Sequence, residues 1–167
     1  MNHDILDNKT NIYLSCVAKG VFTDGSLPKG DYTIVPPVYI SGESQIENGS
    51  IIGPASVILK NTLVAESTHI SKSVLSENTF VSRECLVENS LCGINSTVKK
   101  GGAVLSECVL GYNSVLGDDI LLENGAVILP EAKIFNCYEN CKNDFLCVEE
   151  SSFKNLDVLN ACKLGYI

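Results

Sequence analysis

The sequence predicts an all-β fold, a parallel β-helix of hexapeptide repeats with about six coils, and three observations lead to it. An aliphatic residue recurs every six positions from Ile34 to Ile134, and a small residue stands two positions before most of these. Aromatic residues make up only 7% of the chain, and Trp is absent. A core built from layers of branched aliphatic side chains has this composition. The length of 167 residues favours one domain with short appendages.

The aliphatic column keeps its period of six except at two steps of five, from Ile70 to Leu75 and from Val87 to Cys92. Neither a single strand nor a helix keeps such a period, but a triangular prism does if each hexapeptide forms one flat side and one corner. We interpret the two short steps as one-residue deletions at a corner. The side chains expected to point inward are Ile34, Ile40, Ile46, Ile52, Ile58, Val64, Ile70, Leu75, Val81, Val87, Cys92, Val98, Val104, Leu110, Leu116, Leu122, Ile128 and Ile134.

The small residues are mostly Ser, Thr, Ala, Gly and Cys, and we expect them to face inward close to the corners, where a larger side chain would clash. Glycine follows the aliphatic residue at several repeats, and we expect it to supply the positive φ of a tight corner. These glycines are Gly53, Gly93, Gly111 and Gly117.

The repeat divides the chain into three parts. Residues 1–31 are expected to form a connector and N-terminal cap, with a helical turn over residues 4–9 and a loop over residues 20–30. Residues 32–135 form the β-helix. Residues 136–167 are expected to form a loop and a short helix over residues 152–164 that cover the last coil with apolar side chains. These side chains are Phe145, Leu146, Phe153, Leu156 and Leu159.

The charge pattern restricts the partners. The formal net charge is -8, and the 12 Lys and Arg residues form no run, so the basic face that a nucleic acid or an anionic membrane requires is missing. No apolar segment suggests a signal peptide or a membrane span. We therefore expect a cytoplasmic protein with free thiols. The flat sheets and the ends of the prism offer surfaces for a homo-oligomer, either a dimer or a trimer.

Candidate metal ligands are few. The tail contains a C-x3-C-x5-C cluster of Cys137, Cys141 and Cys147, to which Cys162 or Cys16 would add a fourth zinc ligand. Free thiols are the favoured interpretation of this cluster, because zinc sites use a tighter spacing. Cys85, Cys92 and Cys108 fall in the inward columns, where a cysteine acts as a small apolar side chain. We predict no metal and no cofactor.

The candidate catalytic residue is His69, since the other histidine, His3, lies in the connector. His69 precedes the inward Ile70 and should therefore point outward. Hexapeptide proteins include acyltransferases that use acetyl-CoA and a histidine as general base, so His69 is the catalytic residue of that alternative function. Two histidines cannot supply the three zinc ligands of a γ-type carbonic anhydrase. A solvated surface histidine is the favoured interpretation, with no catalytic residue in this chain.

One segment resembles a known family. The run PPVYISGESQIENGSIIGPASVI, from Pro36 to Ile58, resembles the start of the β-helix in bacterial sugar-phosphate nucleotidyltransferases of the mannose-1-phosphate guanylyltransferase type, and HDILDNK, from His3 to Lys9, resembles their connecting helix. The hexapeptide families wind left-handed, so the resemblance implies a left-handed β-helix. It also implies a scaffold, oligomerisation and regulatory domain. The catalytic domain, with its Gly-rich nucleotide motif, would be a partner outside this chain.

Overall fold

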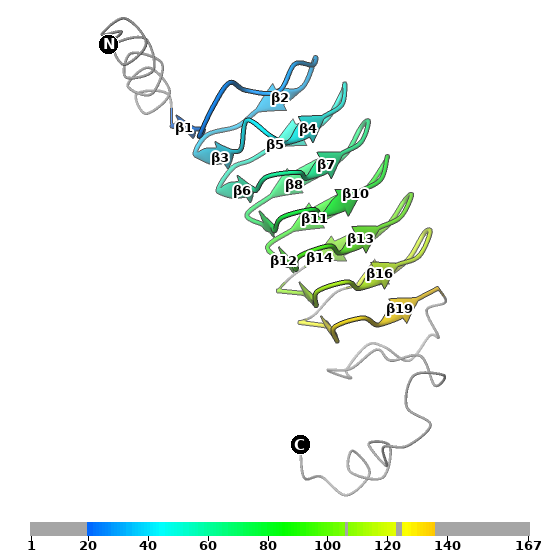
Figure 1. Ribbon diagram of the computed structural model, residues 1–167. Helices are drawn as coiled ribbons and strands as arrows, with labels where there is room; N and C mark the ends of the chain where they lie inside the picture. The colour runs from blue at the N-terminus through cyan, green and yellow to red at the C-terminus, as the bar shows by residue number, and fades with distance from the viewer. Residues whose placement is uncertain (1–19, 106, 123–124, 136–167) are drawn as a thin grey trace, which may run out of the picture.

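The computed structural model describes residues 20–105, 107–122 and 125–135, which form a three-sided prism of parallel sheets (Figure 1). The chain winds around the prism in about six coils, each contributing one strand to each side. This is the parallel β-helix expected from the repeat, with the left hand that the family resemblance implies. Residues 4–9, 152–164 and the expected apolar cover in the tail lie outside the described residues.

Each side of the prism is one sheet. Sheet A has seven strands, in the order β1 (Val21–Phe22), β3 (Val38–Ile40), β6 (Ser56–Ile58), β9 (Val74–Leu75), β12 (Leu91–Cys92), β15 (Val109–Leu110) and β18 (Val127–Ile128). Sheet B has six strands, β2 (Thr33–Ile34), β5 (Ile51–Ile52), β8 (His69–Ser71), β11 (Leu86–Glu88), β14 (Ala103–Leu105) and β17 (Leu121–Leu122). Sheet C also has six strands, β4 (Gln45–Ile46), β7 (Leu63–Val64), β10 (Phe80–Val81), β13 (Thr97–Val98), β16 (Val115–Leu116) and β19 (Lys133–Ile134).

Backbone hydrogen bonds join each coil to both of its neighbours. Outward residues of the strands donate to carbonyls of the following coil, as in Gln45 to Thr62 at 2.8 Å and Leu63 to Thr79 at 2.9 Å. Residues at the corners also donate to the preceding coil, as in Asn78 to Lys60 at 3.1 Å. In the middle of the prism, the backbone N–H and C=O groups on both edges of a coil are therefore hydrogen-bonded.

The N-terminal edge of sheet C is formed by β4, and the loop before β2 lies along it. A Cβ on Gly30 would lie 2.8 Å from the carbonyl oxygen of Ile46, which shows how closely the loop approaches the strand. Asp31 accepts from the backbone N–H of Gly49 at 2.8 Å, and its own N–H donates to Asn48 Oδ1 at 2.9 Å. The loop thus touches the edge of sheet C at Ile46 and at the corner after β4, without pairing with β4 as a strand.

The interior confirms both columns read from the sequence. All of the aliphatic positions are buried except Ile34, which is partly buried in the first coil. The small column is buried from Val38 to Ala132, leaving only Tyr32 partly exposed. Since a fully buried Ile or Leu side chain contributes about 1.5–3 kcal/mol, these stacked columns hold the prism together.

The buried hydroxyls of the small column have backbone partners. Thr68 donates to the carbonyl of Ser82 at 2.8 Å, and Thr62 donates to that of Ser76 at 3.0 Å. Both acceptors belong to the corner of the following coil, so these bonds join successive coils from inside. Ser96 Oγ is a buried side-chain oxygen with no partner in the described part of the chain.

The corners correct our expectation for the glycines. The positive φ falls one residue before the small residue, at non-glycine positions such as Asn61, Asn78 and Asn95, with φ of 55°, 56° and 57°. Asparagine is the non-glycine residue that tolerates this region best. Among the four expected glycines only Gly53 has a positive φ, of 106°.

The other three glycines are required by close packing between coils. A Cβ on Gly93 would lie 2.7 Å from the carbonyl oxygen of Leu110, and a Cβ on Gly117 would lie 2.8 Å from that of Ile134. Gly111 is crowded in the same way by the backbone of Pro130.

Both five-residue steps lie at the corner that joins sheet B to sheet A, at Lys72 and Asn89. Each of these residues has a positive φ, of 49° and 48°. The coils that contain these steps are one residue shorter. His69 pairs with Leu86 and Val74 with Leu91, 17 residues apart, whereas Ala103 pairs with Leu121, 18 residues apart.

The segment predicted as a loop, residues 20–30, contains β1. Val21 pairs with Val38 and Phe22 with Tyr39, so β1 extends sheet A by one strand. Two residues are too short to carry a periodic pattern, which is why this strand was missed in the sequence. No helix in the described part of the chain is long and apolar enough to cross a membrane.

Candidate functional site

The N-terminal end of the prism carries a network centred on Asp24. One carboxylate oxygen accepts from Ser41 Oγ at 2.9 Å, and the other accepts from the backbone N–H of Gly42 at 2.7 Å. The hydroxyl of Tyr39 also bonds to this carboxylate. These bonds fasten the loop after β1 to the corner that follows β3.

The network shifts the titration of both acids. The bond from Gly42 lowers the pKa of Asp24, partial burial opposes the shift, and Ser41 and Tyr39 add smaller lowering contributions. The pKa of Tyr39 is raised by burial, by its bond to Asp24 and by the negative charge there. The carboxylate therefore stays ionised at neutral pH, where it acts as a hydrogen-bond acceptor. The sequence gives no signal for this network, because its members are joined only by the path of the loop.

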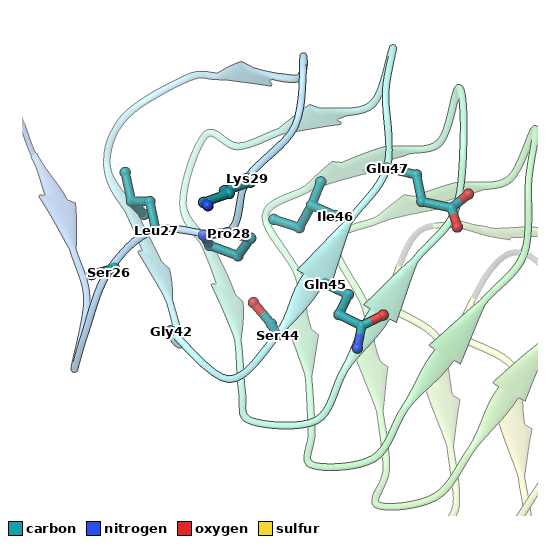
Figure 2. Close-up of a pocket in the computed structure, with 9 residues that line it drawn as sticks. All are labelled: Ser26, Leu27, Pro28, Lys29, Gly42, Ser44, Gln45, Ile46 and Glu47. Atoms are coloured by element: carbon teal, nitrogen blue, oxygen red, sulfur yellow. The ribbon is translucent and has the colours of Figure 1, made fainter.

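A hollow of about 450 Å³ lies beside this network (Figure 2). The loop residues form one wall, and strand β4 with its flanking residues forms the other. The lining residues are Ser26, Leu27, Pro28, Lys29, Gly42, Ser44, Gln45, Ile46 and Glu47.

Internal bonds fix both walls of the hollow. Tyr32 donates from its hydroxyl to the carbonyl of Pro28 at 2.8 Å, and Ser44 donates to that of Ser41 at 2.6 Å. The hollow offers one exposed cation, Lys29, whereas the Glu47 carboxylate accepts from the backbone N–H of Glu66 in the following coil at 3.1 Å and points away from the loop (Figure 2). Its lining contains no nucleophile held against a base.

His69, the candidate catalytic residue, lies on β8 and is exposed on the outer face of sheet B. Its neighbours in the ladder are Ile51 and Leu86. Both are aliphatic, so neither can orient the imidazole or accept a proton from it. The structure places His69 on the far side of the sheet from the core, and the other predicted site residues, Cys137, Cys141 and Cys147, lie outside the described ranges.

The described cysteines lie inside the prism. Cys85, Cys92 and Cys108 are buried, and no disulfide joins them to one another. Burial raises the pKa of Cys85 to about 11 and that of Cys92 to about 12. Cys85 Sγ also donates to the carbonyl of Lys99 at 3.0 Å. A thiol that stays protonated at neutral pH is neither a nucleophile nor a metal ligand.

Cys137, Cys141 and Cys147, the weak metal candidates, lie outside the described residues. Within the described ranges, no group of three or more His, Cys, Asp or Glu side chains is placed to hold a metal ion.

Comparison with solved structures shows the same fold in acetyltransferases. The acetyltransferase domain of PglB from Neisseria gonorrhoeae matches with a TM-score of 0.57 and 17% identity, over 59% of this chain and 49% of that one. A point mutant of perosamine N-acetyltransferase from Caulobacter crescentus, in complex with CoA and GDP-perosamine, matches with a TM-score of 0.59 and 15% identity, over 74% of this chain and 62% of that one. The chain thus spans about half to three fifths of the length of these proteins. At such identities the likeness shows the fold alone.

Comparison of the sequence gives a sharper result. No curated protein matches the chain at a significant level. The family model for the GMPPB C-terminal domain matches residues 34–143. This match begins at the first inward isoleucine, Ile34, and includes every described coil that follows. It agrees with the resemblance of the Pro36–Ile58 run to nucleotidyltransferase β-helices. The chain therefore belongs to the GMPPB C-terminal domain family, the left-handed β-helix that accompanies a nucleotidyltransferase.

Proposed function

We propose that this chain serves as the scaffold, oligomerisation and regulatory domain of a sugar-1-phosphate nucleotidyltransferase. The observation that carries the proposal is the family match over residues 34–143. The described residues support it, because His69 has aliphatic neighbours and burial raises the pKa of the Cys85 and Cys92 thiols.

The partner in this proposal is the catalytic domain that joins an NTP to a sugar 1-phosphate. The hollow between the loop and β4 supports a contact at the N-terminal end, because it offers the exposed charge of Lys29 beside a loop that Asp24 anchors. We also propose a homo-oligomer in the cytoplasm. The absence of disulfides among the described cysteines is compatible with the reducing compartment that we propose.

The test is reconstitution with a nucleotidyltransferase catalytic domain from the same source. We expect the two to co-migrate on gel filtration, and we expect the KM or kcat of pyrophosphate release to change when this chain is added. Lys29→Glu should weaken the complex, whereas the matched charge reversal Lys133→Glu, at the other end of the prism, should not. Absence of a complex at high micromolar concentrations of both proteins contradicts the proposal.

The alternative function is an acyltransferase that uses acetyl-CoA, with His69 as general base. Incubation of the chain with acetyl-CoA and a panel of amino sugars separates the two functions. Turnover that disappears in His69→Ala and persists in Lys133→Ala would establish the alternative. Since Ile51 and Leu86 flank the imidazole, we expect no turnover.

A further inference from the structure

The outer face of sheet A differs in composition from the other two faces. Its outward positions are occupied along the whole sheet by apolar or aromatic residues, which the ladder aligns in one column. The column consists of Phe22, Tyr39, Val57, Val74, Leu91, Val109 and Val127. None of the seven strands contains a charged residue, whereas sheet B contains His69 and Glu88 and sheet C contains Lys133.

The apolar surface is widest in the coils of β12 and β15. Leu91 is 42% exposed and its ladder partner Val109 is 36% exposed. At the adjoining corner Ile94 is 48% and Tyr112 is 49% exposed. The equivalent corner positions in the earlier coils carry Lys60 and Glu77, which form an ion pair at 3.4 Å.

Glycines flatten this surface between the column and the corner. Gly93 follows β12 and Gly111 follows β15, and the packing of the coils leaves no room for a Cβ at either position. Nothing therefore projects between Leu91 and Ile94, or between Val109 and Tyr112. The four side chains present one continuous apolar surface.

We infer that a second copy of this chain packs on this face, giving a dimer in which sheet A lies on sheet A. The inference rests on the homo-oligomer in the proposed function and names its contact surface. In a two-fold dimer each face meets its own copy, so a charged face would meet like charges. The charged residues nearest the column, such as Lys72 and Glu107, lie at the corner that borders the face. With a net charge of -8, two copies therefore approach at less electrostatic cost through the strands of sheet A than through strands that carry charge.

The area of the face fits such a contact. Seven strands about 4.8 Å apart span about 30 Å. The flat side is about five residues wide, or about 17 Å. Each copy then offers about 500 Å², so the contact buries about 1,000 Å² in total, at the lower limit for a specific interface. A contact of this size predicts a dimer that dissociates in the micromolar range.

Sedimentation velocity of the full chain over about 5–500 µM tests the inference. We expect a concentration-dependent shift from the 18.0 kDa monomer to twice that mass. Leu91→Glu should raise the dissociation constant at least tenfold. The matched control is Ile51→Glu, which places the same charge at an outward, 37% exposed position of sheet B and should change the constant less than twofold. Thermal melts of both variants verify that they fold.

The possible results distinguish the claim that the chain forms a homo-oligomer from the claim that sheet A is the contact face. A chain that stays monomeric at the highest concentration overturns both the homo-oligomer and this inference. A dimer that Leu91→Glu leaves intact overturns the choice of sheet A as the contact face, but leaves the homo-oligomer standing. A dimer that Ile51→Glu dissociates has the same meaning, and so does a trimer. A Leu91→Glu variant that fails to fold is replaced by Leu91→Ser, for which the same comparison is made with Ile51→Ser.

Discussion

Ser41 donates from its hydroxyl to the carboxylate of Asp24 at 2.9 Å, across the 17 residues that separate the loop after β1 from the first coil. This bond fixes the loop against the prism. It also makes the attachment depend on the ionisation of Asp24.

We predict that Asp24→Asn lowers the stability of the chain at neutral pH. We also expect the variant to lose less stability than the wild type when the pH is lowered. The pKa of Asp24 is lowered in the folded state, so its contribution is present above the unfolded pKa of about 3.9 and is lost as the pH falls through the folded pKa. The carboxylate is exposed, which limits the effect to about 1 kcal/mol or less. Thermal melts from pH 2 to pH 7 measure it. Asp118→Asn, an exposed corner residue at the other end, is the control and should follow the wild-type curve.

Ser96→Ala should leave stability unchanged or raise it. The hydroxyl of Ser96 is buried without a partner among the described residues, so its removal relieves a desolvation cost without breaking a bond. Ser114→Ala is the matched change in the same column. It should cost about 0.5–1.5 kcal/mol, because Ser114 donates to the carbonyl of Gly111 at 2.7 Å. Urea unfolding compares the two, and an equal loss in both would contradict the prediction.

The same substitution should behave differently in the two inward columns. Cys85 belongs to the small column, where serine is common and where its sulfur already donates to the carbonyl of Lys99. Cys85→Ser should therefore be nearly neutral. Cys92 lies in the aliphatic column and is fully buried, so Cys92→Ser should destabilise by about 1–3 kcal/mol. Denaturant unfolding of both variants measures the two losses of stability. A larger loss for Cys85→Ser than for Cys92→Ser would show that the columns are misassigned.

We expect the interior thiols to resist alkylation while the chain is folded. With a pKa of about 11 for Cys85 and about 12 for Cys92, the thiolate fraction at pH 8 is small, and the prism blocks access. Peptide mass spectrometry after iodoacetamide treatment should find these residues unmodified in buffer and modified in guanidinium chloride. Modification of Cys92 in buffer at the rate seen in denaturant would rule out the burial described above.

Gly93→Ala should destabilise the chain, because the new methyl would lie 2.7 Å from the carbonyl oxygen of Leu110. We expect a loss of about 1–3 kcal/mol, typical of overpacking. Gly25→Ala is the control, since its Cβ would meet its nearest neighbour at 3.6 Å, an ordinary contact. Melting temperatures that fall equally in both variants would mean that the crowding at Gly93 is relieved by a shift of the corner.

The sequence predicted the interior well because the period of six assigns each position to the inside or the outside of the prism. Cys92 was placed correctly by its column although it is not aliphatic. The glycines were assigned the wrong role, since a glycine needed for a left-handed backbone and one needed for close packing look alike in a sequence. Gly93 and Gly53 show this difference.

The candidate sites were harder to predict. The outward position of His69 followed from its place before Ile70, but its aliphatic neighbours depend on the register between coils, which the short step at Lys72 alters. The link between Asp24 and Ser41 could not be predicted, because no period connects an irregular loop to a corner.

The loop that lies along β4 also bears on how copies of this chain can stack. An open strand edge is a template on which another chain can add a strand. If the last coil of one copy paired with the first coil of the next, the contact would be head to tail and would not close on itself, so copies would add without limit as a fibre. The backbone of Gly30 passes close to the carbonyl of Ile46, and Asp31 is hydrogen-bonded to Gly49 and Asn48 at the corner after β4, so the loop obstructs such addition to sheet C at this end. We therefore expect the loop to hinder head-to-tail stacking along sheet C, which favours association through the sides of the prism.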